Sequence, residues 1–379
     1  MKKIQMVDLK SQYEQIKTQI LTGFEEVLEE ASFINGPKVH AFQKELEQYL
    51  GVKHVIPCAN GTDALQIAMM GLGLKPGDEV ITANFTFAAT VEVIALLGLT
   101  PVLVDVDLDT FNISVEKIKK AITPKTRAIV PVHLFGQVAD MELIMQVAKE
   151  HNLFVIEDNA QTIGAEYQFS DGQVKKAGTI GHVAATSFFP SKNLGCYGDG
   201  GAIFTNDDQL AHTIRGIVNH GMYQRYHHDV VGVNSRLDSL QAVVLQAKLP
   251  KLDHYNQNRR EAAFKYSQEL ATCPEVIVPQ IKATEPNSHV FHQYTLRVTN
   301  GKRNELMQYL LANDIPCAIY YPIALSKQKA YQNESYKDTD FPNTNLLVEQ
   351  VLSLPMHSEL DNQQIAYITE HIKAFFKKE

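Results

Sequence analysis

The sequence predicts an α/β fold, in which a large domain with a mainly parallel sheet covered by helices precedes a smaller α+β domain. Strand-like apolar runs alternate with helix-like segments from about residue 54 to residue 205, which is typical of βαβ units and a parallel sheet. Small-residue turns or carboxylates also follow several of these strands. Because ligands of such sheets bind at the carboxyl ends of the strands, we expect these turns to meet at one site.

The large domain begins with helical periodicity. Apolar residues recur at spacings of three and four over residues 9–31 and again over residues 39–50, which predicts two amphipathic helices. Strands are then predicted at residues 54–58, 79–82, 101–107, 128–133, 154–158 and 202–205. The helices expected between them lie at residues 64–71, after 84–90, from Ser114 onward and at 141–150.

The second half of the chain changes character near residue 250. Residues 208–249 are predicted to be helical in two parts, split by the polar stretch 219–229, and a long helix follows Pro250. Further on, the pattern indicates strands at 289–298 and 316–321, a helix at 304–313 and a closing helix at 361–377. We therefore predict a large α/β domain over residues 1–250 and a small α+β domain over residues 251–379.

Composition limits the classes of partner. The 379 residues are 45% hydrophobic and 21% charged, as in soluble globular proteins. The net charge of −8 argues against a general nucleic-acid surface but leaves a local basic pocket possible. Four scattered cysteines without CxxC spacing indicate neither zinc nor a disulfide framework. No run approaches the roughly 18 apolar residues of a membrane span, and no apolar segment follows the initial lysines, so we expect a cytoplasmic protein.

Three local features could carry chemistry. The turn Asn60-Gly61-Thr62 lies between a strand and a helix, where unpaired N–H groups attract anions; an ordinary helix cap by Asn60 or Thr62 is the alternative. Asp158 ends a strand, where it could also be a simple cap. Lys192 lies in a glycine-rich turn and could form an imine with a carbonyl or be an exposed surface charge.

Together with Phe87, these residues suit pyridoxal phosphate (PLP). The aldehyde of PLP needs a lysine, and its pyridine nitrogen needs a carboxylate to stay protonated. Its ring benefits from a stacked aromatic, and its phosphate needs N–H and hydroxyl donors at a helix N-terminus. The signatures GxGxxG after a strand and GxxxxGK[ST] are absent from the sequence, so nothing favours a dinucleotide or P-loop site.

A set of motifs in one order extends this interpretation over most of the chain. The motifs are Cys58-Ala-Asn-Gly-Thr-Asp-Ala-Leu65, Phe85-Thr-Phe-Ala-Ala-Thr90, Pro131-Val-His-Leu-Phe-Gly-Gln137, Glu157-Asp-Asn-Ala-Gln-Thr-Ile-Gly-Ala165, Ser187-Phe-Phe-Pro-Ser-Lys-Asn-Leu-Gly195 with Gly198-Asp-Gly-Gly201, and Gly232-Val-Asn-Ser-Arg-Leu-Asp-Ser-Leu-Gln-Ala242. In this order they resemble the DegT/DnrJ/EryC1/StrS family of nucleotide-sugar aminotransferases, which are fold-type I PLP enzymes. The resemblance implies that fold, PLP as cofactor and a transaminase activity.

The resemblance also assigns roles to single residues. Lys192 resembles the imine-forming lysine that moves the proton during transamination, and Asp158 resembles the partner of the pyridinium. The resemblance implies that Gln161 contacts the ring hydroxyl and that Phe87 stacks on the ring face. It implies phosphate contacts for Gly61, Thr62 and Ser187. Asn234 resembles an asparagine that reaches the cofactor phosphate from a neighbouring subunit, which implies a homodimer with shared active sites. Taken singly, Phe87 could be simple core and Asn234 a turn residue.

The resemblance is narrowest to aminotransferases of UDP-2-acetamido-2-deoxy-3-oxo-D-glucuronate, which take the amino group from L-glutamate, release 2-oxoglutarate and serve O-antigen synthesis. Arg236 is a candidate for the substrate carboxylate or diphosphate, or else pairs with an acid such as Asp238. His228 is expected at the substrate entrance rather than at a metal. Tyr321 belongs to a matching Tyr-Pro-Ile motif, but Tyr320 stands where many relatives have histidine, which leaves the details of the sugar open.

Three alternatives remain at this point. A dTDP-3-oxo-6-deoxyhexose 3-aminotransferase would differ only in the sugar and nucleotide. A PLP sugar dehydratase of the same family would have histidine in place of Lys192. A non-catalytic or regulatory protein of this fold would lose Lys192 or Asp158, and both are present.

Overall fold

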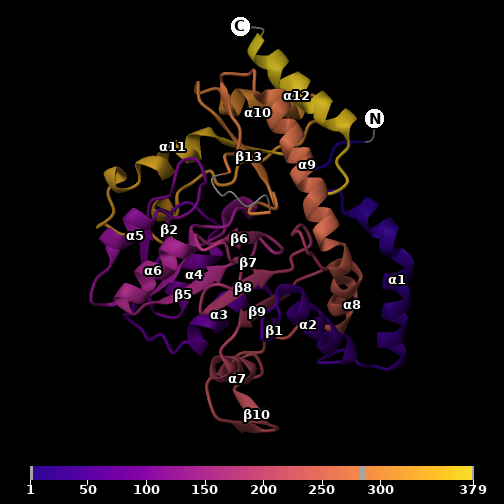
Figure 1. The fold of residues 1–379 in the computed structure, drawn as a ribbon, viewed down its shortest axis with the longest axis vertical. Helices are drawn as coiled ribbons and strands as arrows, with labels where there is room; N and C mark the ends of the chain where they lie inside the picture. The colour runs from indigo at the N-terminus through magenta and orange to yellow at the C-terminus, as the bar shows by residue number, and fades with distance from the viewer. Residues whose placement is uncertain (1–2, 282–286, 378–379) are drawn as a thin grey trace.

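A seven-stranded sheet forms the centre of the computed structural model, which describes residues 3–281 and 287–377 (Figure 1). The strand order is β1-β9-β8-β5-β4-β2-β3. Only β9 runs antiparallel to its neighbours in this sheet, so the predicted mainly parallel sheet is confirmed. The bounds of its strands are β1 His54–Cys58, β2 Glu79–Ala83, β3 Thr100–Val104, β4 Thr126–Val130, β5 Phe154–Asp158, β8 Val183–Ser187 and β9 Gly201–Thr205.

Helices cover both faces of this sheet. Successive strand residues point to opposite faces; thus Val155 packs in the core beneath α5 and α6, whereas Ile156 packs in the core beneath α3, α4 and α7. Helices α1, α2 and α8 complete the first face around Phe204. The bounds of these helices are α1 Leu9–Glu29, α2 Pro37–Leu50, α3 Gly61–Gly71, α4 Ala89–Leu96, α5 Val115–Ala121, α6 Met141–His151, α7 Asp208–Ile217 and α8 Ser239–Lys248.

The tail of the chain builds a second, antiparallel sheet in the order β12-β13-β14. Its core also takes in Ile4 from the other end of the chain, together with Ile365, Ile368 and Ile372 of the last helix. Figure 1 shows α9, α10 and the last helix beside this sheet. The division into domains at residue 250 remains a prediction. The elements of the tail are α9 Leu252–Leu270, β12 Val276–Ile277, β13 Tyr294–Val298, α10 Arg303–Ala312, α11 Pro342–Gln350, β14 Val351–Leu354 and α12 Asn362–Lys377.

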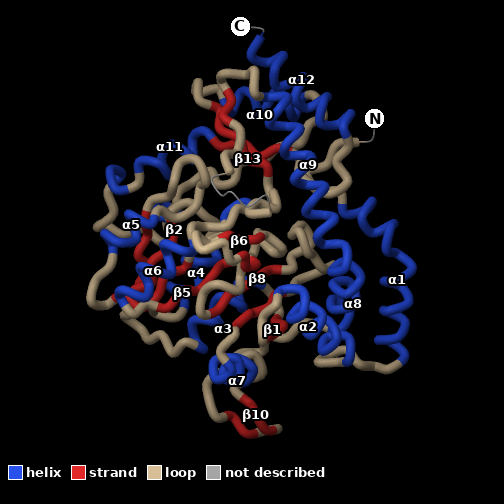
Figure 2. Tube along the Cα trace, viewed as in Figure 1, coloured by secondary structure: helices blue, strands red, loops and turns tan. Residues whose placement is uncertain are grey.

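Small elements decorate the two sheets. A two-stranded hairpin, β10–β11, extends beyond α7 at one end of the molecule (Figure 2). The minor strands are β6 Glu166–Gln168, β7 Val174–Lys176, β10 Met222–Gln224 and β11 His227–His228, and the short 3₁₀ helices span Leu134–Gly136, Leu249–Lys251, Leu325–Lys327 and Asp338–Asp340. No helix within residues 3–281 and 287–377 combines the length and apolarity needed to cross a bilayer.

The predicted elements differ from the structure in several places, the short strands β6, β7, β10, β11 and β12 among them. Strand β8 was not predicted because Val-Ala-Ala-Thr-Ser has one bulky apolar residue, although the strand is buried at the sheet centre. Helix α11 and strand β14 were also missed. The predicted strand 289–298 is reduced to β13, and 316–321 forms only a bridge between Ala318 and Ser353. Pro316 lacks an N–H, and the ring of Tyr321 instead packs near Phe85 and Phe135.

Candidate active site

A cavity of about 720 Å³ opens at the carboxyl ends of the central strands. The ends of β1, β5 and β8 each contribute to it. The ends of β1 and β8 lie at the same edge because the first residue of the antiparallel β9 pairs with the last residue of each of these strands. The cavity gathers the predicted Gly61, Thr62, Phe87, Asp158, Gln161, Ser187, Lys192, Tyr320 and Tyr321. Residues up to 260 positions apart in the chain thus meet at one edge of the sheet, as expected for this fold.

One wall of the cavity is a cradle for an anion. The side chain of Asn60 caps α3 by accepting from the N–H of Asp63 at 2.8 Å, so the alternative of an ordinary cap is also realised. A Cβ on Gly61 would lie 2.7 Å from the Cβ of Ser187; only glycine permits this approach. The start of α3 therefore packs against Ser187, and Gly61, Thr62 and Ser187 line the same cavity, which suits a phosphate.

Asp158 lies buried at the end of β5. Its Oδ2 accepts from the hydroxyl of Thr90 at 2.8 Å, and its Oδ1 accepts from the N–H of Ala160 at 3.2 Å. Burial raises the pKa of Asp158, and the two hydrogen bonds and the charge of Lys192 oppose this shift. A cation placed against this carboxylate would restore its ionised form, which is the property that a pyridinium partner requires.

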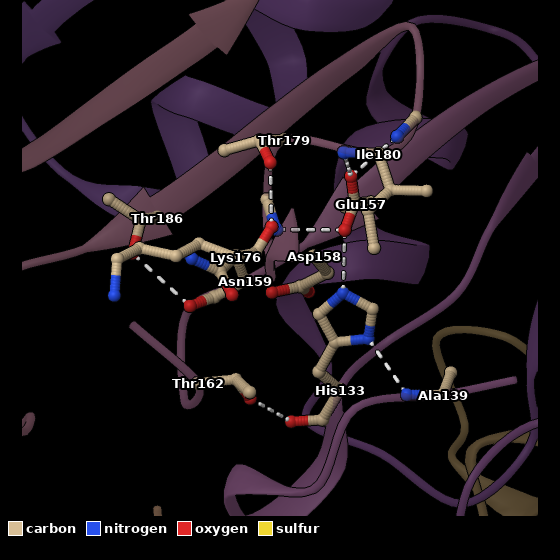
Figure 3. A network of polar contacts seen from close by, with 12 residues as sticks. His133, Ala139, Glu157, Asp158, Asn159, Thr162, Lys176, Thr179, Ile180 and Thr186 are labelled. Carbon is tan, nitrogen blue, oxygen red and sulfur yellow. Dashed lines mark hydrogen bonds and ion pairs between the residues drawn. The ribbon is translucent and has the colours of Figure 1, made fainter. Parts of the chain in front are cut away.

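A second carboxylate, Glu157, lies next to Asp158 in β5 and binds the surrounding backbone (Figure 3). Its oxygens accept from Nε2 of His133 at 2.9 Å and from the N–H groups of Gly178, Ile180 and Gly181 at 2.6–2.8 Å. Desolvation acts to raise the pKa of Glu157, but these hydrogen bonds and His133 outweigh it and lower the pKa. The fully buried carboxylate is thus ionised and fixes the backbone next to Asp158.

The orientation of His133 follows from its two contacts. Its Nδ1 accepts from the N–H of Ala139 at 3.2 Å, so Nε2 carries the proton that is donated to Glu157 (Figure 3). The carbonyl of His133 accepts from the hydroxyl of Thr162 at 2.6 Å. Both ring nitrogens of His133 and both oxygens of Glu157 have partners, which makes this part of the network a rigid support.

Lys192 reaches the same cavity from the turn after β8. Its N–H donates to the carbonyl of Phe189 at 2.8 Å and closes that turn. Desolvation lowers the pKa of Lys192 to about 8, although the charge of Asp158 acts in the opposite direction. A lysine with such a pKa is partly a free amine near neutral pH, as a nucleophile or proton carrier must be.

Aromatic rings and Gln161 frame the remaining part of the cavity. Phe87 is 58% exposed although it belongs to the cavity wall, so it offers a free ring face. Its ring centroid lies 6.2 Å from that of Tyr321. Gln161 accepts from the N–H of Phe135 at 2.6 Å and donates to the hydroxyl of Tyr321 at 3.2 Å. These contacts fix the Gln161 amide beside Asp158.

Three predicted residues do not line the cavity of their own chain. Asn234 is exposed, Arg236 is half-buried, and His228 lies on the hairpin, where Nδ1 contacts the carbonyl of His220 at 2.9 Å. Within the described residues, Arg236 forms no ion pair with Asp238, so that alternative is not realised. Across residues 3–281 and 287–377, no three histidine, cysteine, aspartate or glutamate side chains form a group that could hold a metal ion.

The sequence did not point to several residues of the cavity wall. His292 and Gln293 come from the segment just before β13, and Phe189, Ser191 and Asp199 flank Lys192. Burial lowers the pKa of His292 well below its usual range, with Lys192 and Arg259 adding to the effect. The polar pair His292-Gln293 within an aromatic stretch could have indicated a functional site. Nothing in the neighbouring sequence indicates that this pair shares a cavity with Lys192, a hundred positions earlier.

The donor set fits PLP on structural grounds. A cradle that a Cβ would fill, a buried carboxylate, an exposed aromatic face and a lysine of lowered pKa line one cavity. Each of these suits a different part of the cofactor. Each predicted residue that lines the cavity could therefore contact the part of PLP that was assigned to it.

Comparison with known proteins places the chain among aminotransferases. The model of the DegT/DnrJ/EryC1/StrS aminotransferase family matches residues 14–373. The chain is 46% identical to the UDP-2-acetamido-2-deoxy-3-oxo-D-glucuronate aminotransferase of Pseudomonas aeruginosa, covering 96% of this chain and 98% of that protein. It is 45% identical to the UDP-N-acetyl-3-dehydro-alpha-D-glucosamine 3-aminotransferase of Acidithiobacillus ferrooxidans, covering 98% and 97%. It is also 45% identical to a "Pleiotropic regulatory protein" of Geobacillus stearothermophilus, covering 99% of both.

Solved structures agree with these relatives. A DegT DnrJ EryC1 StrS aminotransferase from Brucella abortus superposes with a TM-score of 0.92 at 41% identity, covering 98% of this chain and 99% of that one. NtdA from Bacillus subtilis, with the bound cofactor PMP, gives a TM-score of 0.87 at 31% identity, covering 96% and 82%.

Proposed function

The chain belongs to the DegT/DnrJ/EryC1/StrS aminotransferase family, and on this premise we propose that it aminates the C-3 ketone of UDP-2-acetamido-2-deoxy-3-oxo-D-glucuronate with L-glutamate as donor. The protein is a PLP-dependent aminotransferase of nucleotide sugars. The observation that carries the proposal is the meeting of Lys192, Asp158 and the Gly61–Ser187 cradle in one cavity. The product would be a precursor for O-antigen or another surface polysaccharide.

When bound, PLP supplies a carbonyl carbon for the amino group and a ring that accepts electrons. Asp158 would hold the ring nitrogen, and Gly61, Thr62 and Ser187 would hold the phosphate. Phe87 would cover one ring face, and Gln161 would contact the ring hydroxyl. The Nζ of Lys192 would accept a proton from the substrate carbon and return it, for which a pKa of about 8 is well placed.

Recognition of a uronate needs a cation near the sugar carboxylate. Lys192 is the only lysine or arginine among the described residues that line the cavity. Arg236 and Asn234 lie outside the cavity of their own chain, and Asn234 is exposed. We therefore propose a homodimer in which Asn234 contacts the cofactor phosphate, and Arg236 and His228 contact the substrate, at the site of the other subunit.

The sugar would then lie between the partner's residues and the tail of the chain that holds the cofactor. Tyr320 and Tyr321 line the cavity from that tail. Tyr320 offers a hydroxyl and a ring where many relatives offer imidazole, so we expect contact with the sugar without a charge. The identity with the P. aeruginosa enzyme supports the UDP-linked uronate as substrate.

The experiment is an assay of 2-oxoglutarate release. Purified protein with PLP and L-glutamate is offered the UDP-linked 3-oxo uronate, its counterpart without the C-6 carboxylate, and a dTDP-3-oxo-6-deoxyhexose. We expect the uronate to give the highest kcat/KM and Lys192→Ala to lose activity by about 10³-fold or more. Replacing the exposed Lys75 by alanine is the control. Turnover with the dTDP sugar alone would contradict the assigned substrate.

A second candidate, a regulatory role, is favoured by one observation, the 45% identity to the "Pleiotropic regulatory protein" of G. stearothermophilus. Such a role predicts ligand binding without turnover. Retention of both Lys192 and Asp158 in one cavity supports catalysis instead. Binding of the UDP sugar with no release of 2-oxoglutarate would favour the regulatory role.

A further inference from the structure

We propose that Lys248 is a positioning residue whose buried ammonium group holds the turn that carries Lys192. The inference rests on the proposed role of Lys192 as the lysine that binds the cofactor. Lys248 is the last residue of α8 and is only 1% exposed. Its Nζ donates to the carbonyl of Gly195 at 2.7 Å, three residues beyond Lys192. Lysine is rarely buried to this extent without a specific partner.

The partner of Lys248 is a turn with little room to move. A Cβ on Gly195 would lie 2.4 Å from the carbonyl oxygen of Pro190 and 2.8 Å from that of Phe189, so the turn folds tightly onto itself. The N–H of Lys192 donates to the carbonyl of Phe189 within the same turn. A donor that fixes the Gly195 carbonyl therefore also fixes the backbone of Lys192.

The charge of Lys248 is stabilised by dipoles instead of a counter-ion. Its Nζ lies 4.7 Å from the ring centroid of Tyr197, a cation–π distance. Among the described residues, no carboxylate forms an ion pair with it. Burial lowers the pKa of Lys248 to about 8, with Cys196 opposing the shift.

Two uncharged contacts hold the same turn. The N–H of Tyr197 donates to Oε1 of Gln241 on α8 at 2.8 Å. The Nδ2 of Asn193 donates to Oδ1 of Asn256 on α9 at 2.7 Å. Helices α8 and α9 therefore support the turn through residues that do not line the cavity. Lys248 provides the one charged contact among these three.

The test separates positioning from plain stability. Methionine in place of Lys248 keeps most of the volume and removes the buried charge, so the desolvation cost of that charge disappears and offsets part of the lost hydrogen bond. It leaves the Gly195 carbonyl without its donor. We prepare K248M, K248R and, as control, K251M, whose lysine lies three residues away on the short helix Leu249–Lys251. For each holoenzyme we measure the visible band of lysine-bound PLP, the rate of PLP loss on dialysis, and the melting temperature of the apo protein.

We expect K248M to lose PLP about tenfold faster, as for a lost hydrogen bond to a charged group, while the apo melting temperature falls by no more than a few degrees. K248R should recover most of the retention, and K251M should match the parent. PLP retention in K248M equal to that of the parent, or a K248R protein that loses PLP as fast as K248M, would overturn the inference.

If K248M does not fold, the comparison of K248R with the parent decides alone. PLP retention in K248R near that of the parent supports the inference, and faster loss overturns it. A parent that never develops the band would overturn the role of Lys192 itself, and the inference with it.

Discussion

The two sides of the active site are built differently. On the cofactor side, Asp158, Glu157 and Gln161 each have fixed hydrogen-bond partners within the chain. On the other side, the segment around the β10–β11 hairpin leaves Asn234 and Tyr226 exposed and outside the cavity. One chain thus holds most of the proposed cofactor contacts in fixed positions. In our proposal, Asn234 at the phosphate and Arg236 and His228 at the substrate come from a second copy.

The largest expected effect concerns the prepared side. Asp158→Asn keeps the shape and removes the charge, so the ring nitrogen of PLP would lose the group that keeps it protonated. We expect kcat to fall by about 10²-fold or more, the range for removal of one preorganised electrostatic contact. Steady-state kinetics with glutamate measures it. Asp171→Asn, an exposed change of the same charge in the β6–β7 turn, should leave kcat within about twofold.

Glu157→Gln tests whether the support behind β5 is electrostatic. The neutral amide would leave the donors of His133 and three backbone amides without their shared carboxylate, and we expect a loss of about 3 kcal/mol in the free energy of unfolding. Urea denaturation at pH 7 measures this loss. Glu150→Gln on the exposed face of α6 is the control; an equal, small effect in both variants would contradict the account.

The same pair of variants should differ in pH dependence. The pKa of Glu157 is lower in the folded protein than its ordinary value, so its stabilising contribution is complete above about pH 4.3, the value for an unfolded chain. This contribution disappears as the pH falls through the lower pKa of the folded state. The stability gap between parent and Glu157→Gln should therefore shrink below pH 4.3 and stay constant above it.

The smallest effect probes the open side. Chains carrying Lys192→Ala and Asn234→Ala are inactive or impaired alone, but a mixed dimer would have one site with both residues intact. If the chains pair at random, half of the dimers are mixed and each has one of two sites restored, so we expect about one quarter of the parental activity. If the activity of the mixture is no higher than the average of the two variants measured separately, shared sites are contradicted.

The same contrast explains how far the sequence alone reaches. Asp158 and the Gly61 turn could be predicted because a strand followed by a small or acidic residue is a local pattern, and parallel strands bring such ends together. His292, Gln293 and Lys248 could not, because each contacts the site through packing between segments that are distant in sequence. Strand β8 escaped prediction because its burial comes from its central place in the sheet rather than from bulky side chains. Tyr321 leaves strand geometry because its ring packs with Phe85, Phe87 and Phe135.

The central claim is that Lys192 is the covalent attachment point of PLP in a cavity prepared by Asp158 and the Gly61 cradle. The most direct measurement is borohydride reduction of the holoenzyme followed by mass spectrometry of its peptides. The account predicts one phosphopyridoxyl group per chain, located on Lys192 and absent after Lys192→Ala, with the buried Lys248 unmodified. A label on another lysine, or no label in a protein that shows the visible band, would contradict it.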